Sequence, residues 1–80
     1  MPAWTFVSTV TVLIRLGLRP VLCDVEADTL CLSPDSLAQA FAGGARAAVP
    51  VHFAGVPVAD AVLDLAQDRD APVVEDCAHA

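Results

Sequence analysis

The sequence predicts an α/β unit with a parallel-type sheet and crossover helices. Short apolar runs that suit buried strands alternate along the chain with segments that suit helices, and the connections between them are short. Such strand–helix–strand repetition produces parallel strands joined by right-handed crossovers. The 80 residues contain no internal repeat and no internal domain boundary, so we expect them to form one unit.

The first predicted element is a helix over residues 6–16, after an extended entry over residues 2–5. Apolar side chains occupy nearly every face of this segment, so periodicity alone does not separate a buried helix from a strand. Its length and the following Gly17 favour a helix, which we expect to be buried on both sides. Arg19-Pro20 then interrupts any continuation.

Three later runs are predicted to be strands, at residues 20–24, 47–51 and 73–74. Each is short and apolar, as expected for a buried strand. Pro50 lacks an amide proton and must therefore lie near a strand end or at an irregularity. Between the first two strands we expect a turn at residues 26–28 and a short extended piece at 30–32.

The clearest local signals mark a helix over residues 34–42. Ser33 can cap its free amides, Pro34 suits the first helical position, and Asp35 complements the helix dipole. Gly43-Gly44 ends it.

After a loop at residues 52–55, a third helix is predicted to begin at Pro57, with one apolar and one acidic face. The apolar face contains Ala59, Val62, Leu63 and Ala66, and the acidic face contains Asp60, Asp64 and Asp68.

Composition excludes several function classes. The net charge is −6, and the only fixed cations are four scattered arginines, so we expect no nucleic-acid partner. The most apolar run, residues 10–18, is interrupted by Arg15 and too short to span a bilayer, and no signal peptide is evident, so we expect no membrane association. Three cysteines without CxxC spacing indicate buried free thiols in a reducing cytoplasm.

The hydrophobic share is 56%, with a mean hydropathy of +0.63. A chain this short needs a large polar share to cover its own surface. We therefore expect it to be part of a larger protein or a subunit of a tight assembly.

Polar residues follow the predicted strands, at the edge where open parallel sheets bind ligands. Asp76 follows a buried strand, where a carboxylate needs a cation or a strong donor, and a protonated heterocyclic nitrogen is one such partner. A helix N-cap is the alternative role for Asp76.

Asp24 suits a turn cap, whereas a structural and a ligand-binding role are equally compatible with His52. The spacing disfavours both a metal site and a Cys77–His79 nucleophile pair.

Four motifs in order carry a resemblance to a known family. They are PAWTFVST at residues 2–9, LRPVLCDV at 18–25, VPVHFAG at 49–55 and VVEDCAHA at 73–80. Together they resemble the DegT/DnrJ/EryC1/StrS family of sugar aminotransferases, and within it the enzymes that make UDP-4-amino-4-deoxy-L-arabinose. The resemblance implies the fold-type-I architecture of enzymes that depend on pyridoxal 5′-phosphate (PLP), with residues 1–80 as a fragment of the PLP-binding large domain.

The same resemblance implies roles for three residues. Asp76 would pair with the pyridine nitrogen of PLP, His79 would lie beside the ring and its phenolic oxygen, and Phe6 would stack on the ring face. Core packing is the alternative role for Phe6, and Trp4 receives no role. The Schiff-base lysine of the family would lie beyond Ala80. Because the chain contains no lysine, we expect no catalytic residue within it and no transamination by it alone.

The implied activity is amino transfer to a nucleotide-linked keto-sugar in amino-sugar or polysaccharide biosynthesis, with glutamate as amino donor. A cytoplasmic homodimer is expected for the complete enzyme. Two alternatives stay open: a non-catalytic α/β remnant or interaction module, and a PLP-dependent sugar dehydratase of the same family, whose members carry histidine in place of the lysine.

Overall fold

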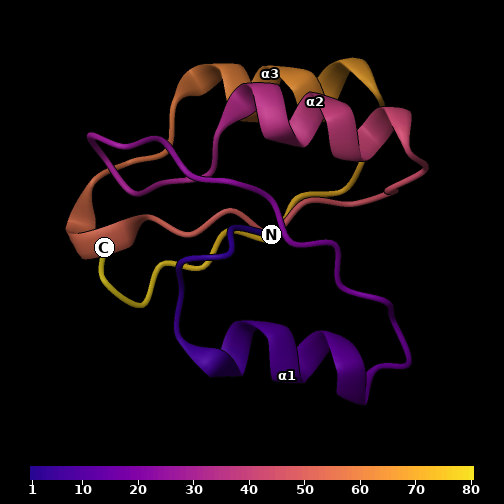
Figure 1. Cartoon of the computed structure of the whole chain (residues 1–80), viewed down its shortest axis with the longest axis horizontal. Helices are drawn as coiled ribbons and strands as arrows, with labels where there is room; N and C mark the ends of the chain where they lie inside the picture. Colours follow the sequence, from indigo (N-terminus) through magenta and orange to yellow (C-terminus); the bar gives the residue numbers. More distant parts are fainter.

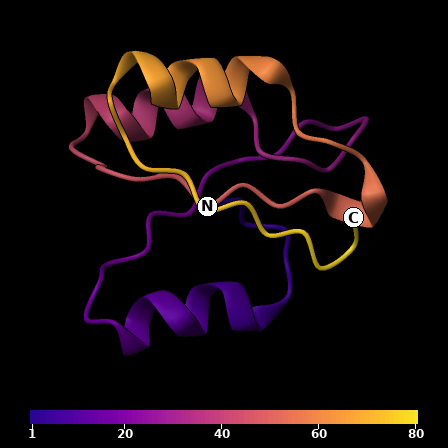
Figure 2. The same cartoon turned by 180° about the vertical axis from the view of Figure 1, so that it is seen from behind.

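The computed structural model describes residues 1–80 and places three helices around a layer of extended segments. The helices are α1 (Val7–Arg15), α2 (Pro34–Ala42) and α3 (Asp60–Asp68), and a 3-10 turn, η1, covers Phe53–Gly55. Figure 1 shows α2 and α3 on one side of the extended layer and α1 on the other, and Figure 2 shows the same three levels from behind. The predicted α/β alternation is confirmed.

The extended layer contains isolated pairings in place of the regular strands that we predicted. The parallel pairings are Pro2–Cys23, Ala48–Val73 and Val51–Asp76, and the antiparallel one is Val25–Leu32. No bridge continues to the next residue, but the Ala48–Val73 and Val51–Asp76 bridges share one parallel register. Prolines at positions 2, 20, 50 and 72 contribute to this difference, because each extended segment thereby lacks an amide donor that a ladder would use.

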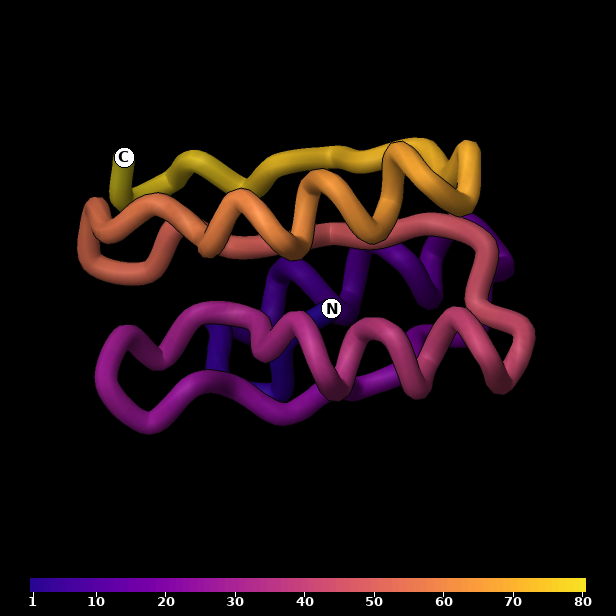
Figure 3. Tube along the Cα trace, turned by 90° about the horizontal axis from the view of Figure 1, so that it is seen from above, coloured from indigo at the N-terminus to yellow at the C-terminus, as the bar shows by residue number.

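Residues 72–76 run beside residues 48–52, as the view from above shows (Figure 3). The amide of Ala48 donates to the Pro72 carbonyl at 3.0 Å, and the amide of Asp76 donates to the Pro50 carbonyl at 2.9 Å. The amide of His52 closes the pairing by donating to the Asp76 carbonyl at 3.1 Å. This register fixes the backbone of Asp76 at the end of the segment.

Helix α2 begins and ends as predicted. The Ser33 hydroxyl accepts the Ser36 amide proton at 3.3 Å, Pro34 occupies the first turn, and Gly43 is the C-cap. Helix α3 begins at Asp60, three residues later than predicted, because Pro57 lies in the extended approach to the helix. Its apolar and acidic faces are as expected: Val62 is fully buried and the aspartates are exposed.

The hydrophobic core lies between the α2–α3 pair and the extended layer. It contains Cys23, Cys31, Leu32, Leu37, Phe41, Ala48, Val58, Val62 and Ala66. Of α1, only Thr9 is buried, and the outward apolar side chains, including Ile14, are exposed. The prediction that this helix is buried on both sides is therefore wrong for this chain, because no element packs on its outer face.

The cysteines also differ from expectation in one respect. Cys23 and Cys31 are buried free thiols, as predicted, whereas Cys77 is exposed because it lies in the turn that follows the extended layer. No helix has the length and apolar character needed to cross a bilayer.

Candidate functional site

The three residues singled out for cofactor binding lie around one shallow depression. Phe6 is the N-cap of α1, Asp76 ends the last extended segment, and His79 lies in the turn beyond it. The depression has a volume of about 40 Å³ and is lined by Thr5, Phe6, Val51, Phe53, Asp76, Ala78 and His79. Residues from both ends of the sequence therefore meet at one place.

Asp76 is half-buried and held by two hydrogen bonds. Its Oδ2 accepts the hydroxyl proton of Thr9 at 2.9 Å, and its Oδ1 accepts the amide proton of Ala78 at 3.1 Å. The second bond comes from the amide two residues later, which is the contact that an Asx turn or a helix N-cap makes, so Asp76 has a local capping role. No arginine lies within ion-pair distance of the Asp76 carboxylate. The single ion pair of the chain joins His52 and Glu75.

His79 is exposed, but two contacts orient its ring. Its Nδ1 accepts the amide proton of Ala54 at 3.1 Å, and the ring packs edge-on against Phe53 with a centroid distance of 5.7 Å. Because Nδ1 is an acceptor, the neutral ring carries its proton on Nε2. Nε2 has no acceptor within the chain and remains available to a ligand.

Phe6 is 75% exposed and takes part in no aromatic pair of the chain. Phe6 therefore has no core-packing role within these 80 residues. Trp4 is also exposed, and its ring meets Phe53 edge-on at 6.2 Å. A large apolar ring left in solvent beside a mainly apolar depression that contains a carboxylate and a histidine is a feature that ligand sites share.

Two other polar candidates have structural roles. The Nδ1 of His52 accepts the Val58 amide proton at 3.1 Å, and its Nε2 lies 2.9 Å from Oε1 of Glu75. Both ring nitrogens of His52 are thus occupied. The carboxylate of Asp24 accepts the amide proton of the next residue, Val25, at 2.9 Å, and not that of the residue after it, so the predicted turn cap is not formed.

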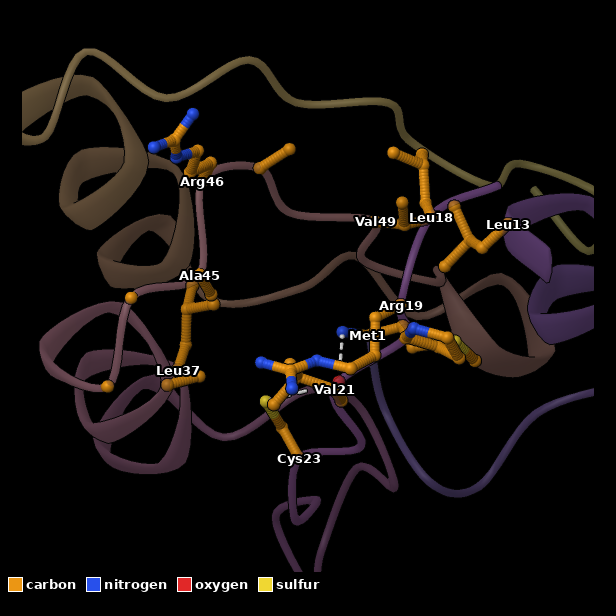
Figure 4. A pocket seen from close by; sticks show the side chains of 15 residues that line it. Met1, Leu13, Leu18, Arg19, Val21, Cys23, Leu37, Ala45, Arg46 and Val49 are labelled. Atoms are coloured by element: carbon orange, nitrogen blue, oxygen red, sulfur yellow. Dashed lines mark hydrogen bonds between the residues drawn. The ribbon is translucent and has the colours of Figure 1, made fainter. Parts of the chain in front are cut away.

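A larger hollow of about 500 Å³ lies elsewhere, between the C-terminal ends of α1 and α2 (Figure 4). Its walls are mainly apolar, with the aliphatic side chains of Leu13, Leu18 and Leu37 among them. Arg19 and Arg46 are its charged lining residues. It contains no carboxylate, histidine or aromatic ring, so we place the candidate site at the smaller depression.

Sequence reasoning singled out neither Phe53, which lines the depression, nor Thr9, which does not line it but contacts the Asp76 carboxylate. Phe53 packs against both Trp4 and His79. Thr9 is the one buried polar residue of α1 and contacts Asp76 directly. No local signal distinguishes Thr9, because Ser8 and Thr11 place other hydroxyls in the same segment.

Comparison with known proteins agrees with the motifs. The model of the DegT/DnrJ/EryC1/StrS aminotransferase family matches residues 1–80. A crystal structure of 3-amino-5-hydroxybenzoic acid (AHBA) synthase is similar, with 38% identity and a TM-score of 0.90 over 99% of this chain and 21% of that one. An aminotransferase from Psychrobacter cryohalolentis is also similar, with 32% identity and a TM-score of 0.90 over 99% of this chain and 20% of that one. The chain thus spans about a fifth of the length of these structures.

Proposed function

Because that family model matches every residue, the chain belongs to the DegT/DnrJ/EryC1/StrS aminotransferase family, and we propose that it forms one wall of a PLP site. The observation that carries this proposal is the meeting of Phe6, Asp76 and His79 at one depression. These residues supply an aromatic face, a carboxylate and an N–H donor, and a substituted pyridine ring can use all three.

The chemistry of the depression fits this cofactor. The Asp76 carboxylate has no cationic partner in the chain, and each of its oxygens accepts one hydrogen bond, which leaves a lone pair on each. A protonated ring nitrogen would supply the missing positive charge. The volume of about 40 Å³ is far below the roughly 300–1,000 Å³ of ligand pockets, so these residues form one side of a site and not an enclosed one.

Each residue has a distinct task in this proposal. Asp76 holds a proton on the ring nitrogen, Phe6 covers one ring face, and His79 donates its Nε2 proton to an acceptor on the ring edge. When bound, PLP supplies an electron-withdrawing ring that stabilises negative charge on the substrate carbon. The lysine that carries the cofactor in this family has to come from outside these 80 residues.

We further propose that the complete enzyme transfers an amino group from glutamate to a nucleotide-linked keto-sugar, as a cytoplasmic homodimer. The likeness of the four motifs to sugar aminotransferases supports this substrate class. The 38% identity to the AHBA synthase favours a second candidate, a reaction that yields a small ring-shaped amino acid such as an amino-hydroxybenzoic acid.

Titration with pyridoxamine 5′-phosphate tests the proposed wall, because this form of the cofactor binds without a lysine. We expect the Asp76→Asn variant, which keeps the side-chain shape and removes the charge, to weaken binding at least about tenfold, or 1.4 kcal/mol. Asp64→Asn is the matched control, since Asp64 is an exposed carboxylate on α3. Equal affinities for the two variants, or no binding to the parent chain, would overturn the proposal.

A further inference from the structure

We infer that Thr9 is a positioning residue that sets the orientation of the Asp76 carboxylate toward its ligand. This inference rests on the proposed function. Thr9 is 4% exposed and is the only polar or charged side chain among the buried residues. Its hydroxyl joins α1 to the last extended segment, across 67 positions of sequence.

The direction of the hydrogen bonds follows from proton counting. An ionised carboxylate can only accept, so the Thr9 hydroxyl donates its single proton to Oδ2 of Asp76, at 2.9 Å. The Oγ1 atoms of Thr5 and Thr9 lie 3.2 Å apart, and Thr9 has no second proton to give. Thr5 is therefore the donor to Thr9, and the two hydroxyls form a relay that points at Asp76.

This relay acts together with the amide of Ala78 as a two-sided clamp. Thr9 holds Oδ2 of Asp76, and Ala78 holds Oδ1, so rotation of the carboxylate would break at least one bond. Hydrogen bonds to a charged group are stronger than those between neutral groups. The carboxylate therefore presents its free lone pairs in one orientation before any ligand arrives.

The same helix also places the proposed ring-stacking residue. Phe6 is the N-cap of α1, and its carbonyl accepts the Thr9 amide proton at 3.2 Å. The hydroxyl of Thr9 thus ties the carboxylate to the turn that carries the Phe6 ring. Through these two contacts, Thr9 links the position of the Phe6 ring to the orientation of the Asp76 carboxylate.

The test compares Thr9→Val, which keeps the side-chain shape but removes the hydroxyl, with Thr9→Ser, which keeps the hydroxyl. The control is Thr11→Val: the Thr11 hydroxyl donates to the Val7 carbonyl at 2.9 Å on the exposed part of α1, away from Asp76. Two quantities are measured in each variant. One is the affinity for pyridoxamine 5′-phosphate, and the other is the side-chain rotamer distribution of Asp76 from NMR three-bond couplings in the absence of ligand.

We expect Thr9→Val to weaken binding about tenfold and to give averaged Asp76 couplings. Thr9→Ser should stay within about threefold of the parent in affinity, and Thr11→Val should change neither quantity. In the Asp76→Asn background, Thr9→Val should cause little further loss, because both changes act on one interaction. If Thr9→Val does not fold, Thr5→Val keeps the buried hydroxyl and should give a smaller weakening of the same kind.

The outcomes separate this inference from the function that it rests on. If Asp76→Asn weakens binding but Thr9→Val does not, Thr9 has no positioning role and the proposed function stands. The same conclusion follows if Thr9→Ser fails to rescue, or if the Asp76 couplings are unchanged in Thr9→Val. If Asp76→Asn leaves binding unchanged, the proposed function fails, and the inference fails with it.

Discussion

Two phenylalanine-to-alanine changes should differ sharply in their effect on stability, because one ring is exposed and the other buried. Phe6 is 75% exposed, whereas Phe41 is 5% exposed and lies in the core cluster. Full burial of a phenylalanine side chain is worth roughly 1.5–3 kcal/mol, so the quarter of Phe6 that is covered corresponds to about 0.4–0.8 kcal/mol. Removal of a fully buried phenylalanine costs roughly 3–5 kcal/mol once the cavity is included.

The comparison is measured by urea unfolding followed by far-UV circular dichroism. We expect Phe41→Ala to lose about 3 kcal/mol or more, with a further contribution from Arg69, whose guanidinium lies 5.8 Å from the Phe41 ring centroid. An 80-residue chain has only about 4–12 kcal/mol of stability in total, so this loss should be evident. If Phe6→Ala costs as much as Phe41→Ala, then Phe6 is a packing residue, and its assignment to a ligand face is refuted.

Three further predictions concern local structure. Ser33→Ala should cost about 1 kcal/mol in thermal unfolding because α2 loses its N-cap acceptor, and an unchanged melting temperature would contradict that role. Gly55→Ala should destabilise more than Gly17→Ala: both glycines have positive φ, but a Cβ on Gly55 would lie 3.2 Å from the His79 carbonyl oxygen, whereas Gly17 faces open space. Equal losses of unfolding free energy would show that this close approach has no consequence. In the folded chain, Cys77 alone should react rapidly with a thiol reagent, and three rapid thiols would contradict the burial of the other two.

Sequence reasoning predicted best the elements whose ends are determined by residues next to them in the chain. Ser33, Pro34 and Gly43 act on their own helix, and α2 begins and ends where these residues predict. The extended layer was harder to predict, because a strand depends on the partner it meets. Apolar composition indicated extended segments correctly, but it gave no measure of how far each pairing would extend. The exposure of α1 depends on neighbours in the same way.

In the candidate site, too, residues with local signals were predicted and residues that depend on distant partners were not. Asp76 could be singled out because a carboxylate that follows an apolar run needs a partner, and the family motifs indicated Phe6 and His79. Thr9 was missed because its partner lies at the other end of the chain, and nothing near it in sequence reveals that contact. His52 was undecided until the structure showed a partner for each of its ring nitrogens.

The depression draws on the start of the chain, on Val51 and Phe53 in its middle and on its last five residues, so its formation requires three distant segments to come together. Contacts so distant in sequence cost the most loop-closure entropy and are late to form. Ligand binding at this depression would therefore report on global folding and not on any one segment. A substitution in the distant α2–α3 core that loosens the layers should reduce occupancy there, even though it touches none of the lining atoms.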